Sequence, residues 1–135
     1  MRQTIMVSGG FDPIHAGHIR LIQDARRYGD VIVALNSDAW LNRKKGFAFM
    51  SWEHRAEILR AIVGVKDVIA VDDADGTVRA AIRSNMPALF ANGGDRAKGN
   101  TPEVLTCQEL GVTLVWRVGG EKIQSSSELT SALPK

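Results

Sequence analysis

Short apolar runs rich in β-branched residues alternate along the chain with segments in which apolar residues recur at helical spacing. A short apolar run bounded by turn residues is typical of a buried strand, and apolar residues three and four apart are typical of a helix. The alternation predicts βαβ units and a parallel sheet. The predicted strands cover residues 4–8, 31–35, 67–71, 88–91 and 112–116.

The segments between these strands supply the predicted helices, while residues 36–50 and 92–101 are polar or glycine-rich and are predicted to be loops. The helices are residues 16–28, a segment that Ser51 can cap and Gly64 ends, residues 77–84, a segment opened by Pro102, and a last helix beginning near 125–127. Right-handed crossovers then give an α/β fold with a doubly wound, five-stranded parallel sheet of the Rossmann-like kind. Ligands of such sheets bind beyond the carboxyl ends of the strands, near the reversal in strand order. We therefore expect the site among the loops at 9–18, 36–50, 92–101 and 119–127.

Composition and charge narrow the class of protein. The chain has 135 residues, 44% hydrophobic and 24% charged, which predicts one globular domain over residues 1–135. Its formal net charge of +2 is too small to predict binding to nucleic acid or to an anionic membrane.

The apolar runs and the cysteine content indicate where in the cell the protein is expected. The longest apolar run, 31–35, is far shorter than the ~20 residues of a membrane-spanning helix, and residues 1–10 lack a secretory apolar region. We therefore expect a cytoplasmic protein. The single cysteine, Cys107, excludes an intrachain disulfide and is expected in the core.

The turn between the first strand and the first helix carries the candidate chemistry. Gly9 and Gly10 let the backbone turn tightly and approach a ligand. His15 and His18, three residues apart, share one face of the first helical turn, and Gly17 between them costs about 1 kcal/mol relative to alanine. Free N–H groups at a helix N-terminus together with two imidazoles predict a phosphoryl site.

Two other interpretations of this turn stay open. Both histidines can be polar residues at a solvated helix start. Asp12, His15 and His18 can also supply three metal ligands, although their spacing matches no zinc motif, and we predict no protein-held metal.

Gly10-Phe11-Asp12 followed by His15-Ala16-Gly17-His18 resembles the signature of the cytidylyltransferase-like nucleotidylyltransferases. The similarity continues in order through Asn36-Ser37-Asp38, Arg43-Lys44-Lys45-Gly46, Trp52-Glu53-His54-Arg55, Gly93-Gly94-Asp95 and Ser125-Ser126-Ser127. The reaction that the resemblance implies joins a nucleoside triphosphate (NTP) to a phosphorylated alcohol or sugar and releases pyrophosphate. In-line attack on the α-phosphorus needs positioning and charge stabilisation rather than a protein nucleophile.

The resemblance also implies roles for individual residues. His15 and His18 would bind the α- and β-phosphates as donors, and Lys45 would neutralise transferred and leaving phosphates, with Lys44 able to share the task; the catalytic set is thus His15, His18 and Lys45. The implied nucleotide-binding residues are Gly9, Gly10, Phe11, Asp12, Gly17, Asn92, Gly94, Asp95, Ser125, Ser126 and Ser127. The implied acceptor-binding residues are Asp38, Lys44, Arg55 and Arg117.

Several of these residues have structural alternatives. The serine triplet also reads as a helix cap, Asp95 as an Asx turn, and Asp38 as a loop cap. Arg55 and Arg117 could equally form structural ion pairs. Asp12 could orient a water or cap the helix. Mg²⁺ is expected with the triphosphate, held mainly by phosphates and water. Small members of the family commonly form homodimers, although the sequence identifies no interface.

Competing functions share parts of the pattern. Ser8-Gly9-Gly10-Phe11-Asp12 is similar to the loop of ATP pyrophosphatases, but Pro13 stands where that loop needs serine. Class I aminoacyl-tRNA synthetases use similar histidine elements, yet their Lys-Met-Ser-Lys-Ser segment is missing. A non-catalytic nucleotide-binding module is the alternative from another class. Among transferases, the motifs favour ATP with a sugar phosphate, as in heptose-phosphate adenylyltransferase domains, and CTP with glycerol 3-phosphate stays an alternative.

Overall fold

The computed structural model describes residues 3–92 and 101–120, which form a parallel sheet with helices on both faces. Its elements are β1 (Thr4–Gly9), α1 (Ala16–Ala25), β2 (Asp30–Leu35), α2 (Asp38–Lys45), α3 (Trp52–Arg60), β3 (Val65–Ala70), α4 (Arg79–Asn85), β4 (Leu89–Asn92), α5 (Pro102–Leu110) and β5 (Thr113–Trp116). The strand order is β3-β2-β1-β4-β5 and every pairing is parallel. The predicted α/β fold with a doubly wound, five-stranded sheet is therefore confirmed.

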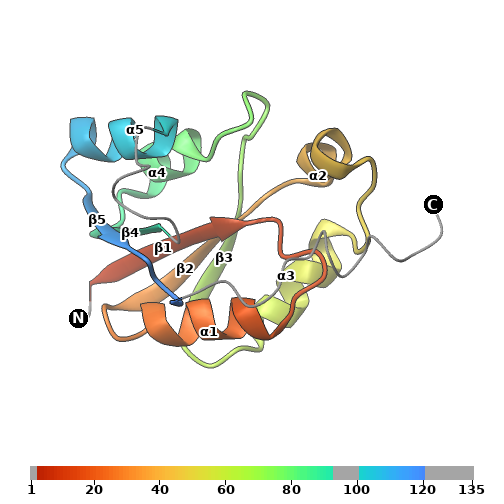
Figure 1. The fold of residues 1–135 in the computed structure, drawn as a ribbon, viewed down its shortest axis with the longest axis horizontal. Helices are drawn as coiled ribbons and strands as arrows, with labels where there is room; N and C mark the ends of the chain where they lie inside the picture. The colour runs from red at the N-terminus through yellow and green to blue at the C-terminus, as the bar shows by residue number, and fades with distance from the viewer. Residues whose placement is uncertain (1–2, 93–100, 121–135) are drawn as a thin grey trace.

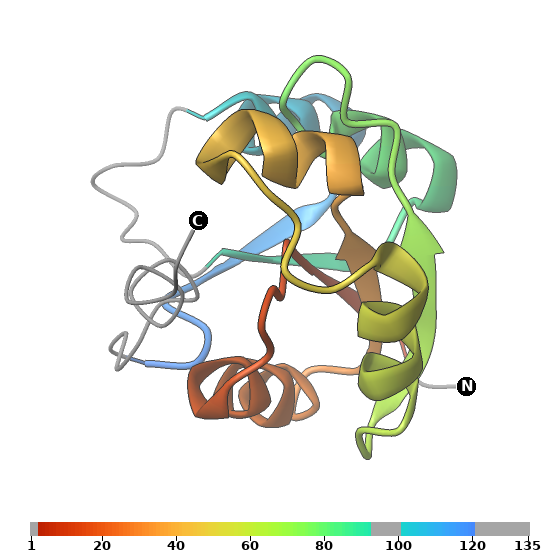
Figure 2. The same ribbon diagram turned by 90° about the vertical axis from the view of Figure 1, so that its right-hand side faces the viewer.

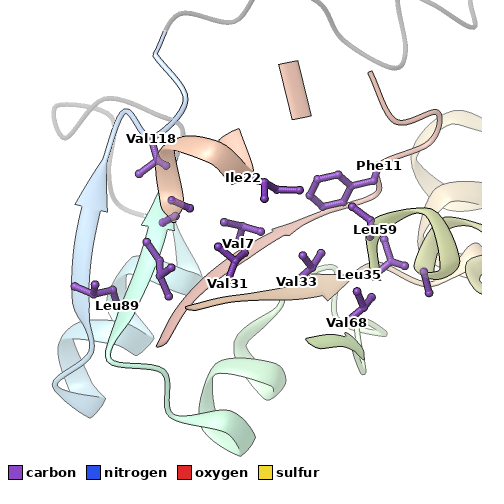
Figure 3. Close-up of a cluster of buried hydrophobic side chains, with 14 residues drawn as sticks. Val7, Phe11, Ile22, Val31, Val33, Leu35, Leu59, Val68, Leu89 and Val118 are labelled. Atoms are coloured by element: carbon purple, nitrogen blue, oxygen red, sulfur yellow. The ribbon is translucent and has the colours of Figure 1, made fainter. Parts of the chain in front are cut away.

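The two faces of the sheet hold separate cores, because successive side chains of a strand point to opposite sides. Ile5 and Val7 of β1 pack with Ile22 of α1 in one cluster, which Figure 3 shows, while Met6 packs with Cys107 of α5 in the other. Figure 1 shows α1 and α3 below the sheet and α4 and α5 above it. Cys107 is fully buried, as predicted, and burial raises the pKa of its thiol to about 11.

The strand order reverses between β1 and β4. From β1 the chain moves outward through β2 to β3 and then returns to the other side of β1. Figure 2 looks onto the carboxyl ends of the strands, where the chain leaving β1 runs to α1 below α2 and beside α3. Ligands of doubly wound sheets bind at this edge.

The predicted loop 36–50 is wrong over its middle, because residues Asp38–Lys45 form α2. The Ser37 hydroxyl caps this helix by accepting from the Trp40 amide at 3.0 Å, and Gly46 ends it in a left-handed conformation. Only Leu41 is buried, so no apolar stripe marks the helix in the sequence.

Other boundaries differ less. Helix α1 ends at Ala25, three residues before the predicted end, and the helix expected near 125–127 lies outside the described residues. None of the helices within the described ranges has the length and apolar character needed to cross a bilayer.

Candidate active site

The turn after β1 is held by close packing within the protein. A Cβ on Gly10 would lie 2.8 Å from Leu41 Cδ2 and 3.3 Å from the Trp40 ring, so glycine here lets α2 approach. Phe11 has a positive φ of 50° and is 3% exposed. Its ring lies in the core, and the ring centroids of Phe11 and His18 are 4.6 Å apart. Phe11 therefore contacts His18 from the hydrophobic core.

His15 and His18 form a capping box at the start of α1. His15 Nδ1 accepts from the Gly17 amide at 3.0 Å, and the His15 amide donates to His18 Nδ1 at 3.1 Å. A backbone amide only donates, so neither Nδ1 carries a proton, and the proton of each neutral imidazole lies on Nε2. The rings stack with centroids 3.9 Å apart. The fold thus sets both rings as Nε2–H donors, which is the role that the phosphoryl prediction requires.

His15, and not Asp12, caps the helix, and the Asp12 carboxylate is buried. That carboxylate accepts from the amides of Phe49 and Met50, at 2.6 and 2.7 Å, in the linker between α2 and α3. Lys45 Nζ donates to the Asp12 carbonyl at 2.6 Å and lies 3.4 Å from the carboxylate. Lys45 therefore lies against the turn that carries the histidines.

Arg55 is fully buried and its guanidinium is occupied by the fold. It donates to the carbonyls of Met50, Gly10 and Asn36, and Nη2 forms an ion pair with Asp38 at 2.6 Å. Of the two interpretations of Arg55, these contacts favour the structural ion pair over acceptor binding. The Asp38 side chain, 44% exposed, is the outer partner of that pair.

Asp73 is a residue that the sequence interpretation missed. It follows β3 and accepts from Asn36 Nδ2 at 3.0 Å, the Ser37 amide at 2.8 Å and the Ser37 hydroxyl at 2.7 Å. Burial alone raises the pKa of Asp73, but these hydrogen bonds outweigh burial and hold its pKa below the usual value. Asp73 thereby anchors the start of α2, and the cluster of aspartates after β3 was the available signal.

A pocket of about 340 Å³ opens where β1 and β4 end, at the reversal in strand order. Its lining combines apolar side chains with a few polar ones: Val7, Ser8, Leu21, Phe90, Ala91, Asn92, Thr101 and Glu103. Leu21 lies three residues beyond His18 on α1, about 4.5 Å along the helix axis. The helix that begins at the histidine turn therefore supplies one wall of the pocket.

The remaining predicted site residues are spread around this edge. Lys44 is exposed, with Nζ 4.7 Å from the Trp40 ring centroid, and Arg117 is exposed after β5 with a positive φ of 56°. Gly94, Asp95, Ser125, Ser126 and Ser127 lie outside the described residues.

A helix N-terminus with two imidazoles lies beside the reversal in strand order, which is where doubly wound sheets bind their ligands. The chain belongs to the cytidylyltransferase-like family, whose pattern it matches over residues 6–129, and so to a class of nucleotidylyltransferases.

Individual relatives agree with this assignment. The chain is 39% identical over 112 residues to a bifunctional protein HldE of Streptomyces coelicolor, covering 80% of this chain, and 37% identical over 122 residues to that of Proteus mirabilis, covering 88%. It spans 24% of the length of each.

Solved structures share the fold. A lipopolysaccharide core biosynthesis protein from Thermoplasma volcanium superposes with a TM-score of 0.68 at 17% identity, covering 86% of this chain and 94% of that one. A bifunctional NMN adenylyltransferase/ADP-ribose pyrophosphatase from Francisella tularensis gives 0.64 at 17% identity, covering 97% of this chain and 41% of that one.

Proposed function

We propose that this chain transfers a nucleoside monophosphate from an NTP, with ATP preferred, to a phosphorylated sugar and releases pyrophosphate. The observation that carries the proposal is the capping box, which directs the protons of both imidazoles to Nε2 at a helix N-terminus. Two fixed donors there suit the α- and β-phosphates of an NTP. Family membership supports the reaction class.

The reaction needs no covalent intermediate with the protein. An oxygen of the acceptor phosphate attacks the α-phosphorus, and the bond from that phosphorus to the bridging oxygen breaks. The electron pair leaves with pyrophosphate, where negative charge accumulates. His15 and His18 donate to these oxygens in a geometry that the helix cap holds before the substrate arrives, and such preorganised donors stabilise developing charge.

Lys45 approaches the same turn from α2 and is proposed to neutralise phosphate charge. The pocket at the ends of β1 and β4 is proposed to hold the nucleoside, because it is lined in part by the helix that carries His18 and has an apolar wall suited to a base. Lys44, Asp38 and Arg117 remain candidates for the acceptor, whereas Arg55 is proposed to act on the fold alone.

Mg²⁺ is proposed to arrive with the triphosphate. Among residues 3–92 and 101–120 no group of three or more His, Cys, Asp or Glu side chains is placed to hold a metal ion. Asp12, the carboxylate nearest the histidine turn in sequence, is committed to two amides and Lys45. The residues therefore fit an ion held by phosphates and water, which neutralises part of the triphosphate charge when bound.

A substrate panel tests the proposal. Each of the four common NTPs is incubated with Mg²⁺ and with sugar phosphates or glycerol 3-phosphate, and pyrophosphate release and the nucleotide-linked product are measured. We expect the largest rate with ATP and a sugar phosphate. A largest rate with CTP and glycerol 3-phosphate supports the alternative substrate pair. NTP binding without pyrophosphate release from any pair contradicts transfer and indicates a non-catalytic nucleotide-binding module.

A further inference from the structure

The pocket between β1 and β4 has two chemically different halves. Val7 and Ala91 belong to the core cluster beneath the sheet, on the side of α1, and Leu21 of α1 adds a third apolar wall. Strand alternation places Ser8 and Asn92 toward the opposite face, where α5 lies. A ligand in this pocket therefore meets an apolar surface on one side and hydrogen-bonding groups on the other.

Glu103, in the first turn of α5, contributes a carboxylate to the polar half. It is half-buried, and within residues 3–92 and 101–120 no hydrogen bond or ion pair engages it. The side chain is not needed to cap α5, because the Thr101 hydroxyl accepts from the Val104 amide. Its charge does reach the Cys107 thiol, whose pKa it raises together with burial.

Other carboxylates at this edge of the sheet are committed to the fold. Asp12 and Asp73 accept backbone amides, and Asp38 pairs with Arg55. Glu103 differs from these three because it lines a pocket and, among the described residues, no hydrogen bond or ion pair engages its carboxylate. A carboxylate that lines a pocket can accept a hydrogen bond from a donor on a bound ligand.

We propose that Glu103 selects the nucleotide by accepting a hydrogen bond from an N–H or O–H donor of the nucleoside, an inference that rests on the proposed function. A carboxylate only accepts, so it favours a base with an exocyclic amino group over one with a carbonyl at that position. A ribose hydroxyl is the other source of the same donor chemistry. The negative charge also disfavours phosphate in this half of the pocket, which orients the triphosphate toward His15 and His18.

The test is equilibrium binding, so that it does not depend on turnover. Isothermal titration calorimetry compares ATP, inosine triphosphate (ITP), 2′-deoxy-ATP and 3′-deoxy-ATP, each with Mg²⁺, on the unaltered chain and on the variants E103Q and E109Q. ITP has a carbonyl in place of the adenine amino group, and the deoxy analogues each lack one ribose hydroxyl. Glu109 is an exposed residue of the same helix and serves as the matched control.

If the base amino group is the donor, the unaltered chain binds ATP about tenfold or more tightly than ITP. The glutamine amide of E103Q offers both an acceptor and a donor, so the ratio falls to within about threefold, while E109Q keeps the original ratio. If a ribose hydroxyl is the donor, the ATP-to-ITP ratio is unchanged in E103Q, and the loss of affinity for one deoxy analogue becomes smaller because the neutral amide oxygen is a weaker acceptor than the carboxylate.

Equal ratios for E103Q and the unaltered chain with every analogue overturn the role of Glu103 and leave nucleotidyl transfer intact. No binding of any triphosphate to the unaltered chain overturns the proposed function and this inference with it. Circular dichroism checks the fold of each variant. If E103Q does not fold, E103D gives the comparison, because it keeps the charge at the helix start and withdraws the oxygens by one methylene. We then expect E103D to reduce the same ratio, and an unchanged ratio overturns the proposal.

Discussion

Two polar regions meet at the carboxyl edge of the sheet and use similar residue types in different ways. Beneath α2, Arg55 and Asp73 form hydrogen bonds with backbone and side-chain partners inside the protein. At the start of α1, His15 and His18 give one ring nitrogen to the helix cap and hold the proton on the other. Arg55 and Asp73 thus serve the stability of the fold, whereas the cap sets the tautomer of two rings that are candidates for binding.

The largest effect is expected from Arg55→Met, which removes the guanidinium at the centre of the hydrogen bonds beneath α2. The change leaves Asp38 without its ion pair and three carbonyls without a donor, so we expect a loss of about 3–5 kcal/mol in the free energy of unfolding. Urea denaturation measures the loss. Arg83→Met, at an exposed position of α4, is the control and should change stability by no more than about 0.5 kcal/mol. A folded R55M of unchanged stability whose KM for the acceptor is raised would return Arg55 to the substrate site.

His18→Ala removes one of the two imidazoles at the start of α1. We expect kcat/KM to fall about 10²–10³-fold because a donor to developing charge is lost, and stability to fall by about 1 kcal/mol because the His15 amide loses its acceptor. Pyrophosphate release and thermal unfolding measure the two effects separately. His54→Ala changes an exposed histidine of α3 and should leave the rate unchanged. Near-normal turnover in H18A contradicts the assignment.

Acid titration tests the structural role of Asp73. The hydrogen bonds that hold the start of α2 favour the ionised carboxylate and lower its pKa. A group whose pKa is lower in the folded state adds stability above its unfolded pKa, about 3.9, and loses that contribution as the pH falls toward its folded pKa. We expect Asp73→Asn to cost about 1–3 kcal/mol at pH 7 and progressively less below pH 4. Denaturation at pH 7, 5 and 3.5 gives the comparison. A difference between the two proteins that does not shrink at the lowest pH contradicts this role.

The smallest effect is expected at Lys45, which reaches from α2 to the turn before α1. Lys45→Ala should lower kcat about tenfold, because phosphate charge loses a neutralising ammonium. It should leave the circular dichroism spectrum unchanged, since Asp12 keeps both amide donors. Lys44→Ala, at an exposed neighbour, should have a weaker effect on the rate. Unfolding of K45A would instead assign the lysine to the structural region.

The sequence by itself determined the alternation of strands and helices and the parallel sheet, and it predicted where a phosphoryl site would lie. These features depend on periodicity, turn residues and caps, which act between near neighbours in the chain. The same local patterns predicted His15 and His18 as donors, and the capping box between them is a contact across three residues.

Only the tertiary structure decided the existence of α2, the role of Arg55 and the difference between Glu103 and the other carboxylates. Helix α2 buries little more than Leu41 and is held by Asp73, 36 residues from Ser37 in sequence. Arg55 donates to Gly10, 45 residues away. The function of a charged side chain depends on which partners the fold brings to it, and those partners are distant in sequence.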